Sequence, residues 1–422
     1  MGGCFSKGFQ EYGGGSMKQY EGAMEDDIRI RDGGSLVRLQ GSSRYTSMFT
    51  QQGRKGINQD AMTVWENFSG EKDTYFCGVF DGHGPSGHKI ARHVRDILPS
   101  KLYSAIKMSH LSTSKYGDTD SRDYNGNGDN SHDHFLSSWE SSLIKSFKEM
   151  DEQLCHDPTI DGFCSGTTAV TVIKQGDHLI VANLGDSRAV LCTRDSTNQL
   201  VPVQLTNDLK PNLPSECERI RNCKGRVFSL DEEPDVLRIW MPEENYPGLA
   251  MSRAFADFCL KDYGLISIPE VSYRKLTSND EFVVLATDGI WDVLTDSEVI
   301  SIVDSATKRS TTAQLLVHRA VKAWRVKFPG CKIDDCAVIC LFLKNQPLLS
   351  KSVSEVTEGS INNLKLAISH RSGSIRGEGD HESGNGKEES NEDDGVSRVN
   401  SLVNISVQNR KRPEKATEGL EA

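Results

Sequence analysis

The sequence predicts an α+β fold in which antiparallel sheets are flanked by helices. Short segments rich in Val, Ile, Phe and Ala have the length and composition of strands, and they occur in groups. Segments with helical periodicity stand between these groups and do not alternate strictly with single strands. This order favours antiparallel sheets covered by helices over a doubly wound parallel sheet.

The chain of 422 residues divides by composition into three segments. Residues 1–45 are rich in Gly and polar side chains without a sustained period, which predicts a flexible N-terminal segment. Residues 46–345 carry the strand and helix signals and have the size of one large domain. Residues 346–422 are rich in Ser, Glu, Gly, Asn and Lys with few aromatic residues, which predicts a disordered tail.

Six strands are predicted in the central segment, at 75–81, 168–174, 179–184, 189–193, 282–287 and 337–343. A turn-like link, Gly185-Asp186-Ser187, joins the third of them to the fourth and predicts an antiparallel hairpin.

Five helices are predicted, at 86–107, 135–156, 215–222, 296–306 and 312–327. Residues 110–134 are polar and rich in Gly, Asn and Asp, which predicts a long exposed loop. Residues 229–247 contain prolines and acidic residues and predict an irregular surface flap. Trp240 and Tyr246 in this flap are candidates for contact with a substrate or a regulator.

Composition excludes several classes of partner. The formal net charge is -11 and no block of Lys and Arg offsets it, so we expect no nucleic-acid partner. The 11 cysteines form no CxxC pair and no secretory signal precedes them, which indicates reduced thiols in a cytosolic protein. The longest apolar runs are too short to cross a bilayer.

Aspartates recur at the ends of the predicted strands. Asp81 and Asp288 each end an apolar run, Asp186 lies in the link between two strands, and Asp335 directly precedes another strand. Any one of them alone is more often a turn or cap residue. Several carboxylates brought together repel one another unless cations neutralise them, and all-oxygen ligands favour Mg²⁺ or Mn²⁺.

Seven motifs in order give a specific resemblance. They are Gly53-Arg54-Lys55-Gly56-Ile57-Asn58-Gln59-Asp60, Val79-Phe80-Asp81-Gly82-His83-Gly84, Ser165-Gly166-Thr167-Thr168-Ala169, Asn183-Leu184-Gly185-Asp186-Ser187-Arg188, Leu249-Ala250-Met251-Ser252-Arg253-Ala254-Phe255, Ala286-Thr287-Asp288-Gly289-Ile290-Trp291-Asp292 and Asp334-Asp335-Cys336. Through them the chain resembles the metal-dependent protein phosphatases of type 2C, in particular plant members. The resemblance implies a central antiparallel β-sandwich with helices on both outer faces, and a serine/threonine protein phosphatase acting on phosphoproteins.

The resemblance also implies a set of metal ligands. Asp81 would bridge two Mg²⁺ or Mn²⁺ ions, the carbonyl of Gly82 would bind one of them, and Asp288 and Asp335 would complete the protein ligands. Asp186 and Asp292 match positions associated with a weaker third ion, and Asp60 would hold water bound to the metals.

Arg54, Asp60 and His83 are the candidates for the chemistry itself, which is hydrolysis by a water molecule that the two metals activate. Arg54 is the candidate phosphate clamp, with Lys55 as the competing choice. His83 is the candidate general acid for the leaving seryl or threonyl oxygen, and its alternative role is to orient a water molecule.

The sequence departs from the family pattern at three positions. Gln59 stands where many members have Glu, Leu209 stands at a frequent His position, and Ala256 replaces the usual Gly before Asp257. None of these removes a ligand implied by the resemblance, so we expect activity.

Met1-Gly2-Gly3-Cys4-Phe5-Ser6 matches the pattern for N-myristoylation at Gly2. Because one myristoyl chain binds membranes only marginally, Cys4 is the expected palmitoylation site that would add a second lipid. We therefore expect a monomer held peripherally at the cytoplasmic face of the plasma membrane, with cytoplasm or nucleus as the other locations. A catalytically inactive, membrane-tethered scaffold that binds phosphoproteins is the alternative function.

Overall fold

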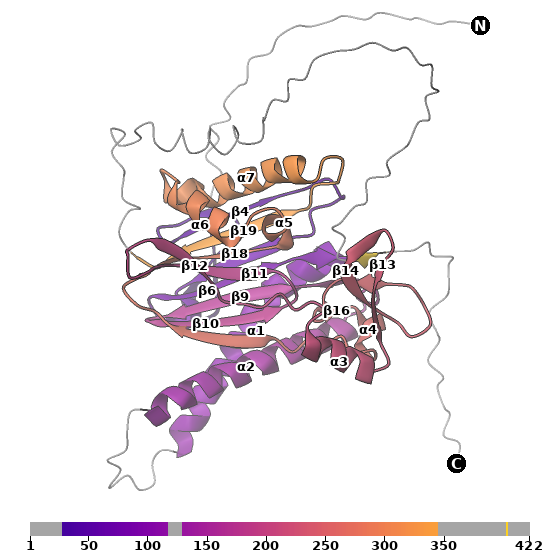
Figure 1. Ribbon diagram of the computed structural model, residues 1–422. Coiled ribbons are helices and arrows are strands. Elements are labelled where there is room, and N and C mark those ends of the chain that lie inside the picture. Colours follow the sequence, from indigo (N-terminus) through magenta and orange to yellow (C-terminus); the bar gives the residue numbers. More distant parts are fainter. Residues whose placement is uncertain (1–27, 117–128, 345–401, 404–422) are drawn as a thin grey trace, which may run out of the picture.

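The computed structural model describes residues 28–116, 129–344 and 402–403, and the fold is presented for these ranges. Two large antiparallel sheets lie face to face, and helices cover both outer faces (Figure 1). The predicted α+β fold with a helix-flanked β-sandwich is therefore confirmed. None of the helices in these ranges combines the length and apolar character that a membrane span needs.

The first large sheet has seven strands in the order β1-β2-β5-β6-β9-β10-β17. Their bounds are β1 (Ile28–Arg31), β2 (Ser35–Arg38), β5 (Ala61–Glu66), β6 (Thr74–Phe80), β9 (Ala169–Gln175), β10 (His178–Leu184) and β17 (Glu270–Lys275). Because successive side chains of a strand point to opposite faces, β6 serves two cores. Phe76 and Phe80 pack toward the helices, whereas Cys77 and Val79 pack toward the other sheet.

The second large sheet has six strands in the order β12-β11-β18-β19-β4-β3. Their bounds are β3 (Gly41–Ser42), β4 (Thr46–Gln51), β11 (Arg188–Arg194), β12 (Leu200–Gln204), β18 (Asp280–Ala286) and β19 (Cys336–Phe342). Val283 and Leu285 of β18 pack between the sheets, and Phe282 and Val284 pack against the helices above. Both sheets therefore bury apolar side chains on each face.

Helices form the two outer layers. The outer face of the seven-stranded sheet is covered by α1 (Gly87–Tyr116) and α2 (Asp129–His156), and that of the six-stranded sheet by α5 (Asp288–Trp291), α6 (Asp296–Asp304) and α7 (Thr312–Lys327) (Figure 1). The start of α6 is fixed by a capping box, in which Thr295 and Glu298 each accept a hydrogen bond from the other's backbone N–H. Three short 3-10 turns lie at η1 (Asp32–Gly34), η2 (Phe68–Gly70) and η3 (Arg309–Thr311).

Two small sheets lie at one end of the sandwich. A three-stranded sheet contains β7 (Gly82–His83), β8 (Gly166–Thr167) and β16 (Phe255–Ala256), and a four-stranded sheet contains β13 (Arg226–Leu230), β14 (Glu233–Trp240), β15 (Gly248–Leu249) and β20 (Leu402–Val403). The helices α3 (Pro214–Asn222) and α4 (Phe258–Lys261) lie at the same end (Figure 1).

Short strands lie within both flanking segments. Strands β1 and β2 extend the seven-stranded sheet, so the described residues ahead of 46 already include regular structure, from Ile28 onward. Val37 of β2 is buried in the core. Within the predicted tail, Leu402–Val403 pairs with Gly248–Leu249. Residues 1–27, 345–401 and 404–422 lie outside the described ranges, and Gly2 and Cys4 are among them.

The predicted hairpin at Gly185-Asp186-Ser187 is wrong. β10 pairs with β9 and β17 in the seven-stranded sheet, whereas β11 pairs with β12 and β18 in the six-stranded sheet. The link therefore carries the chain from one sheet to the other. Gly185 adopts φ 108, a conformation that favours glycine, at the point of this crossing.

Two predicted inserts are more regular than expected. Helix α1 continues to Tyr116 and α2 begins at Asp129, so helices enter the 110–134 segment from both sides. The flap at 229–247 contains most of the β13–β14 hairpin.

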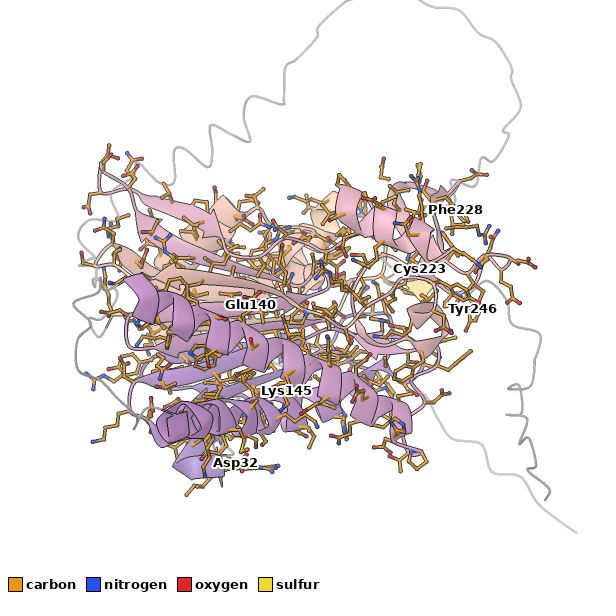
Figure 2. The ribbon with its side chains drawn as sticks, turned by 90° about the horizontal axis from the view of Figure 1, so that it is seen from below. Asp32, Glu140, Lys145, Cys223, Phe228 and Tyr246 are labelled. Atoms are coloured by element: carbon orange, nitrogen blue, oxygen red, sulfur yellow. The ribbon has the colours of Figure 1, made fainter. Side chains whose placement is uncertain are left out.

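The prediction of a surface role for Trp240 is also wrong. Its indole is fully buried, donates to the carbonyl of Phe228 at 3.0 Å and stacks on the Phe228 ring with centroids 4.9 Å apart. Tyr246 is half-buried and lies with Phe228 at the flap end of the molecule (Figure 2). Within the flap, only Tyr246 of these two candidates reaches the surface.

Candidate metal centre

Six aspartates from five segments of the chain gather in one acidic cluster. They are Asp60 before β5, Asp81 after β6, Asp186 between β10 and β11, Asp288 and Asp292 at the two ends of α5, and Asp334 before β19. Five of the six were predicted as site residues. The sheets bring them together because their strands end at the same side of the sandwich.

The electrostatics of the cluster demand a cation. Burial raises the pKa of Asp81, and the charges of Asp288 and Asp60 raise it further. The pKa of Asp288 is raised by burial and by Asp334, although a hydrogen bond with Asp81 acts in the opposite direction. Uncompensated buried carboxylates are costly, so the cluster is stable at neutral pH only with protons or cations bound.

Asp81 is held by a rigid backbone. Its carbonyl accepts from the Thr168 backbone N–H at 2.9 Å and from the Thr167 hydroxyl at 3.0 Å, and its own N–H donates to the Thr168 hydroxyl at 3.0 Å. At Gly82 a Cβ atom would lie 2.5 Å from the carbonyl oxygen of Gly87. Only glycine therefore lets the chain pass here, and the two threonines explain why the Ser165–Ala169 motif belongs to the site.

Asp60 is oriented from two sides. Its carboxylate accepts from the Thr287 hydroxyl at 2.8 Å, and its N–H donates to the Asn58 side chain at 3.0 Å. Burial raises the pKa of Asp60, and the negative charge of Asp335 raises it further. Since Thr287 directly precedes Asp288, one hydrogen bond couples two members of the cluster.

The structure gives the two adjacent acids before β19 different surroundings. One carboxylate oxygen of Asp335 accepts from the backbone N–H of Gly53 at 2.7 Å, and the other accepts from that of Gln59 at 2.8 Å. Asp335 thus fastens the loop that precedes Asp60. The charge of Asp334 acts on Asp288 and Asp81, and that of Asp335 acts on Asp60. The choice of Asp335 as a metal ligand stays a prediction.

The structure also separates the two candidate phosphate clamps. The Lys55 ammonium forms an ion pair with Asp334. Burial opposes the charge on Lys55, but the carboxylates of Asp334 and Asp288 outweigh burial and raise its pKa. The Arg54 side chain is exposed, and no ion pair is found for it among the residues the structure describes. Of the two candidate clamps, Lys55 is therefore the one that lies next to the cluster.

A second lysine lies at the other end of the cluster and was not predicted. The ammonium of Lys210 lies 3.4 Å from a carboxylate oxygen of Asp186. The charges of Asp186 and Asp292 raise the pKa of Lys210, against the effect of burial. The other carboxylate oxygen of Asp186 is buried without a hydrogen-bond partner. Asp186 and Asp292 therefore share a subsite that a protein cation borders.

His83 has a partner that the sequence did not reveal. Its Nε2 lies 2.5 Å from a carboxylate oxygen of Asp257, and both side chains are buried. Sequence separation of 174 residues hides this pair from any local motif. The three-stranded sheet creates it, because β7 carries His83 and β16 leads directly into Asp257.

The departures from the family pattern have structural roles. Gln59 donates from its amide to the Gly84 carbonyl at 3.1 Å. Leu209 is buried, and its carbonyl accepts from both the N–H and the hydroxyl of Ser252. Ala256 has φ 59, a left-handed conformation that favours glycine.

A buried ion-pair network fixes the segment around Ser252 and Arg253. Glu216 of α3 accepts from the guanidinium groups of Arg219 and Arg253, with shortest distances of 2.7 Å to each. It also accepts from the Ser252 hydroxyl at 2.6 Å. Burial opposes the charge on Glu216, but these hydrogen bonds lower its pKa to about 2.

The donor set fits hard divalent cations. Among the described residues, no three His, Cys, Asp or Glu side chains close into a tight metal cage. An all-carboxylate cluster that is spread out in this way suits Mg²⁺ or Mn²⁺, since Mg²⁺ keeps several waters and takes few protein ligands. The unpartnered oxygens of Asp186 and Gln59 leave acceptors for such ions and their waters.

Known proteins resemble this chain in sequence and in structure. The family model "Protein phosphatase 2C" matches residues 44–325. "Probable protein phosphatase 2C 65" of Arabidopsis thaliana is 52% identical over 375 residues, covering 88% of this chain and 94% of that protein. "Probable protein phosphatase 2C 73" of Oryza sativa subsp. japonica is 54% identical over 367 residues, covering 85% of this chain and 86% of that protein. The solved serine-threonine phosphatase 2C from Toxoplasma gondii has a TM-score of 0.64 and 24% identity, covers 74% of this chain and 99% of its own, and supports the fold.

Proposed function

This chain belongs to the protein phosphatase 2C family, and we propose that its acidic cluster is the centre that hydrolyses phosphoserine and phosphothreonine in proteins. The chain is a metal-dependent serine/threonine protein phosphatase. One observation carries the assignment of the centre: four buried and two half-buried aspartates from five segments of the chain gather at one side of the sandwich, where burial and their mutual charge raise their pKa values. Such a cluster requires cations, and the family requires them for catalysis.

Two Mg²⁺ or Mn²⁺ ions would be held by Asp81, Asp288, Asp334 and the carbonyl of Gly82. Asp186 and Asp292 would hold a weaker third ion, beside the competing charge of Lys210. Bound divalent cations would supply positive charge to the phosphoryl oxygens and acidity to a water molecule. The ion count and this ligand assignment are part of the proposal.

The chain's own residues bind the phosphate and move the proton. Lys55 offers a cation to the phosphoryl oxygens, because its ammonium already lies beside Asp334. Asp60, fixed by Thr287, accepts a hydrogen bond from the attacking water. His83, which Asp257 orients, delivers a proton to the leaving seryl or threonyl oxygen.

The test is phosphate release from a phosphothreonine peptide with Mn²⁺ or Mg²⁺ added and then chelated. Wild type is compared with Asp81→Asn, and circular dichroism confirms that both are folded. Release that needs the metal and is lost in the variant supports the proposal. No release from folded wild type with either ion would overturn it and would favour the inactive phosphoprotein-binding scaffold.

We also propose lipid anchoring at Gly2 and Cys4, which rests on the sequence motif alone. Myristoyl and palmitoyl chains together would hold the protein at the cytoplasmic face of the plasma membrane. Metabolic labelling with alkyne analogues of the two fatty acids tests this in cells. Gly2→Ala should lose both labels, whereas Cys4→Ser should lose only the palmitoyl label.

A further inference from the structure

Two free cysteines touch each other next to the candidate catalytic histidine. The Sγ atoms of Cys164 and Cys259 lie 3.5 Å apart, and no disulfide joins them. Cys164 lies in the loop before β8, and Cys259 lies in α4. They are 95 residues apart in sequence, so only the tertiary fold brings them together.

The backbone enforces this contact. The N–H of Asp257 donates to the Ser165 carbonyl at 2.9 Å, and the N–H of Cys259 donates to the Phe163 carbonyl at 3.0 Å. These bonds bracket Cys164 on both sides. The backbone hydrogen bonds therefore hold the two thiols close together, whatever rotamer either side chain adopts.

We propose that Cys164 and Cys259 form an oxidisable dithiol site, at which a hydroperoxide converts the two thiols into an intramolecular disulfide. Cys164 is the attacking residue because its side chain is half-exposed, whereas Cys259 is 5% exposed and serves as the resolving residue. The more exposed thiol can meet a hydroperoxide first, and the buried thiol beside it can then react with the oxidised sulfur.

Hydrogen bonds support the same division. The hydrogen bond with Cys259 lowers the pKa of Cys164, and another with Tyr246 acts in the same direction against the effect of burial. The hydrogen bond with Cys164 and burial raise the pKa of Cys259, which stays a thiol. Cys164 therefore supplies the thiolate that reacts with peroxide.

The chemistry balances in two steps. The Cys164 thiolate attacks one oxygen of the hydroperoxide, the O–O bond breaks, and a sulfenic acid forms while the other oxygen leaves as hydroxide or alkoxide and takes up a proton. The Cys259 sulfur then attacks the sulfenic sulfur, the S–O bond breaks, and water leaves with the Cys259 proton. The two thiols lose two electrons, and the peroxide gains them.

Formation of the bond would displace the residues around His83. The sulfurs must approach from 3.5 Å to the length of a disulfide, about 2.05 Å. The carbonyl of Cys164 lies where a Cβ on Gly84 would contact it at 2.5 Å, so this segment packs tightly against the motif that carries His83. Asp257, which holds His83, lies two residues before Cys259. This consequence rests on the proposed function, whereas the disulfide itself does not.

The decisive experiment treats the folded full-length protein with a small excess of hydrogen peroxide, blocks free thiols, and maps peptides without reduction. We expect a peptide pair linked through Cys164 and Cys259, whose link dithiothreitol removes. Cys164→Ser and Cys259→Ser should each abolish it, and Cys155→Ser, which removes an exposed cysteine of α2, should leave it intact. Recovery of Cys164 and Cys259 as alkylated thiols or as separate sulfinic acids in wild type would overturn the proposal.

Phosphatase activity is the second measurement. Oxidised wild type should lose activity on the order of tenfold or more, since a displacement of about 1 Å at a catalytic group can cost about a hundredfold. Dithiothreitol should restore it, and Cys164→Ser should resist the loss. A mapped disulfide with undiminished activity would overturn the regulatory effect. An inactive reduced enzyme would count against the proposed function and leave the mapping result valid.

Discussion

The backbone N–H of Gly53 donates to the carboxylate of Asp335 at 2.7 Å, across 282 residues of sequence. The second oxygen of the same carboxylate is occupied by the N–H of Gln59. One side chain at the start of β19 thus fixes both ends of the loop that carries Arg54 and Lys55. The neighbouring Asp334 is left to face the acidic cluster.

The two adjacent acids should respond differently to substitution. Asp334→Asn should lower Mn²⁺ affinity at least about tenfold, because it removes a charge from the cluster. Asp335→Asn should lower the free energy of unfolding by about 1–3 kcal/mol, since one buried backbone N–H loses its acceptor. Calorimetric titration with Mn²⁺ and thermal unfolding measure the two effects. The opposite pattern would restore Asp335 as the ligand.

Substitution of Lys55 and substitution of Arg54 should affect phosphate binding to different degrees. Lys55→Met should raise the inhibition constant for inorganic phosphate about tenfold, the equivalent of about 1.4 kcal/mol, because an ammonium beside the cluster is lost. Arg54→Met should change it little, since its side chain is exposed. Lys55→Arg serves as the charge-conserving control and should retain most of the binding. A larger effect at Arg54 would refute the assignment.

The leaving group should reveal the role of His83. His83→Asn should lower kcat about a hundredfold for a phosphothreonine peptide, whose alkoxide must be protonated as it leaves. For p-nitrophenyl phosphate the loss should be much smaller, because nitrophenolate leaves without a proton. Asp257→Asn should follow the same trend through its contact with His83. Equal losses on both substrates would instead indicate that His83 orients water.

Glu216 should make stability depend on acid pH. Its pKa falls from an ordinary 4.5 to about 2 in the folded protein, chiefly because Arg219 and Arg253 outweigh burial. The unfolded state therefore binds the proton first, and the stabilisation is present above pH 4.5 and lost as the pH falls toward 2. At neutral pH this amounts to about 3 kcal/mol.

The check is urea unfolding of wild type and Glu216→Gln between pH 7 and pH 3. The stability difference between them should shrink as the pH falls through that window. Arg221→Gln, on the same helix but outside the network, is the control and should show no such trend. A constant difference would contradict the shift.

Ala256→Gly should be nearly neutral for stability. The left-handed φ of 59 costs an alanine about 1–3 kcal/mol, which the glycine recovers. Loss of the buried methyl, about 0.8 kcal/mol, and the greater freedom of glycine in the unfolded chain offset that gain. Ala182→Gly in β10 has no strain to relieve and should lose about 1–2 kcal/mol. Equal losses in the two variants would mean that Ala256 is unstrained.

The sequence by itself determined six central strands of the sandwich and the order of the site motifs. Apolar runs such as 337–343 must be buried, and their period leaves little choice of structure, so β19 at Cys336–Phe342 was predictable within one residue. Asp81 and Asp288 could also be picked out from the sequence, because each is a charged residue at the end of such an apolar run. The monomeric state and the N-terminal lipids stay predictions.

Only the tertiary structure decided which neighbour each residue meets. Local pattern made Gly185-Asp186-Ser187 a hairpin turn, whereas pairing across the sandwich made it a crossing between sheets. Of two adjacent acids, Asp335 faces the loop and Asp334 faces the cluster. The pairs His83–Asp257 and Cys164–Cys259 join distant segments. Periodicity reports which face of an element is buried, but hydrogen bonds and charges depend on distances that form only when the sheets pack together.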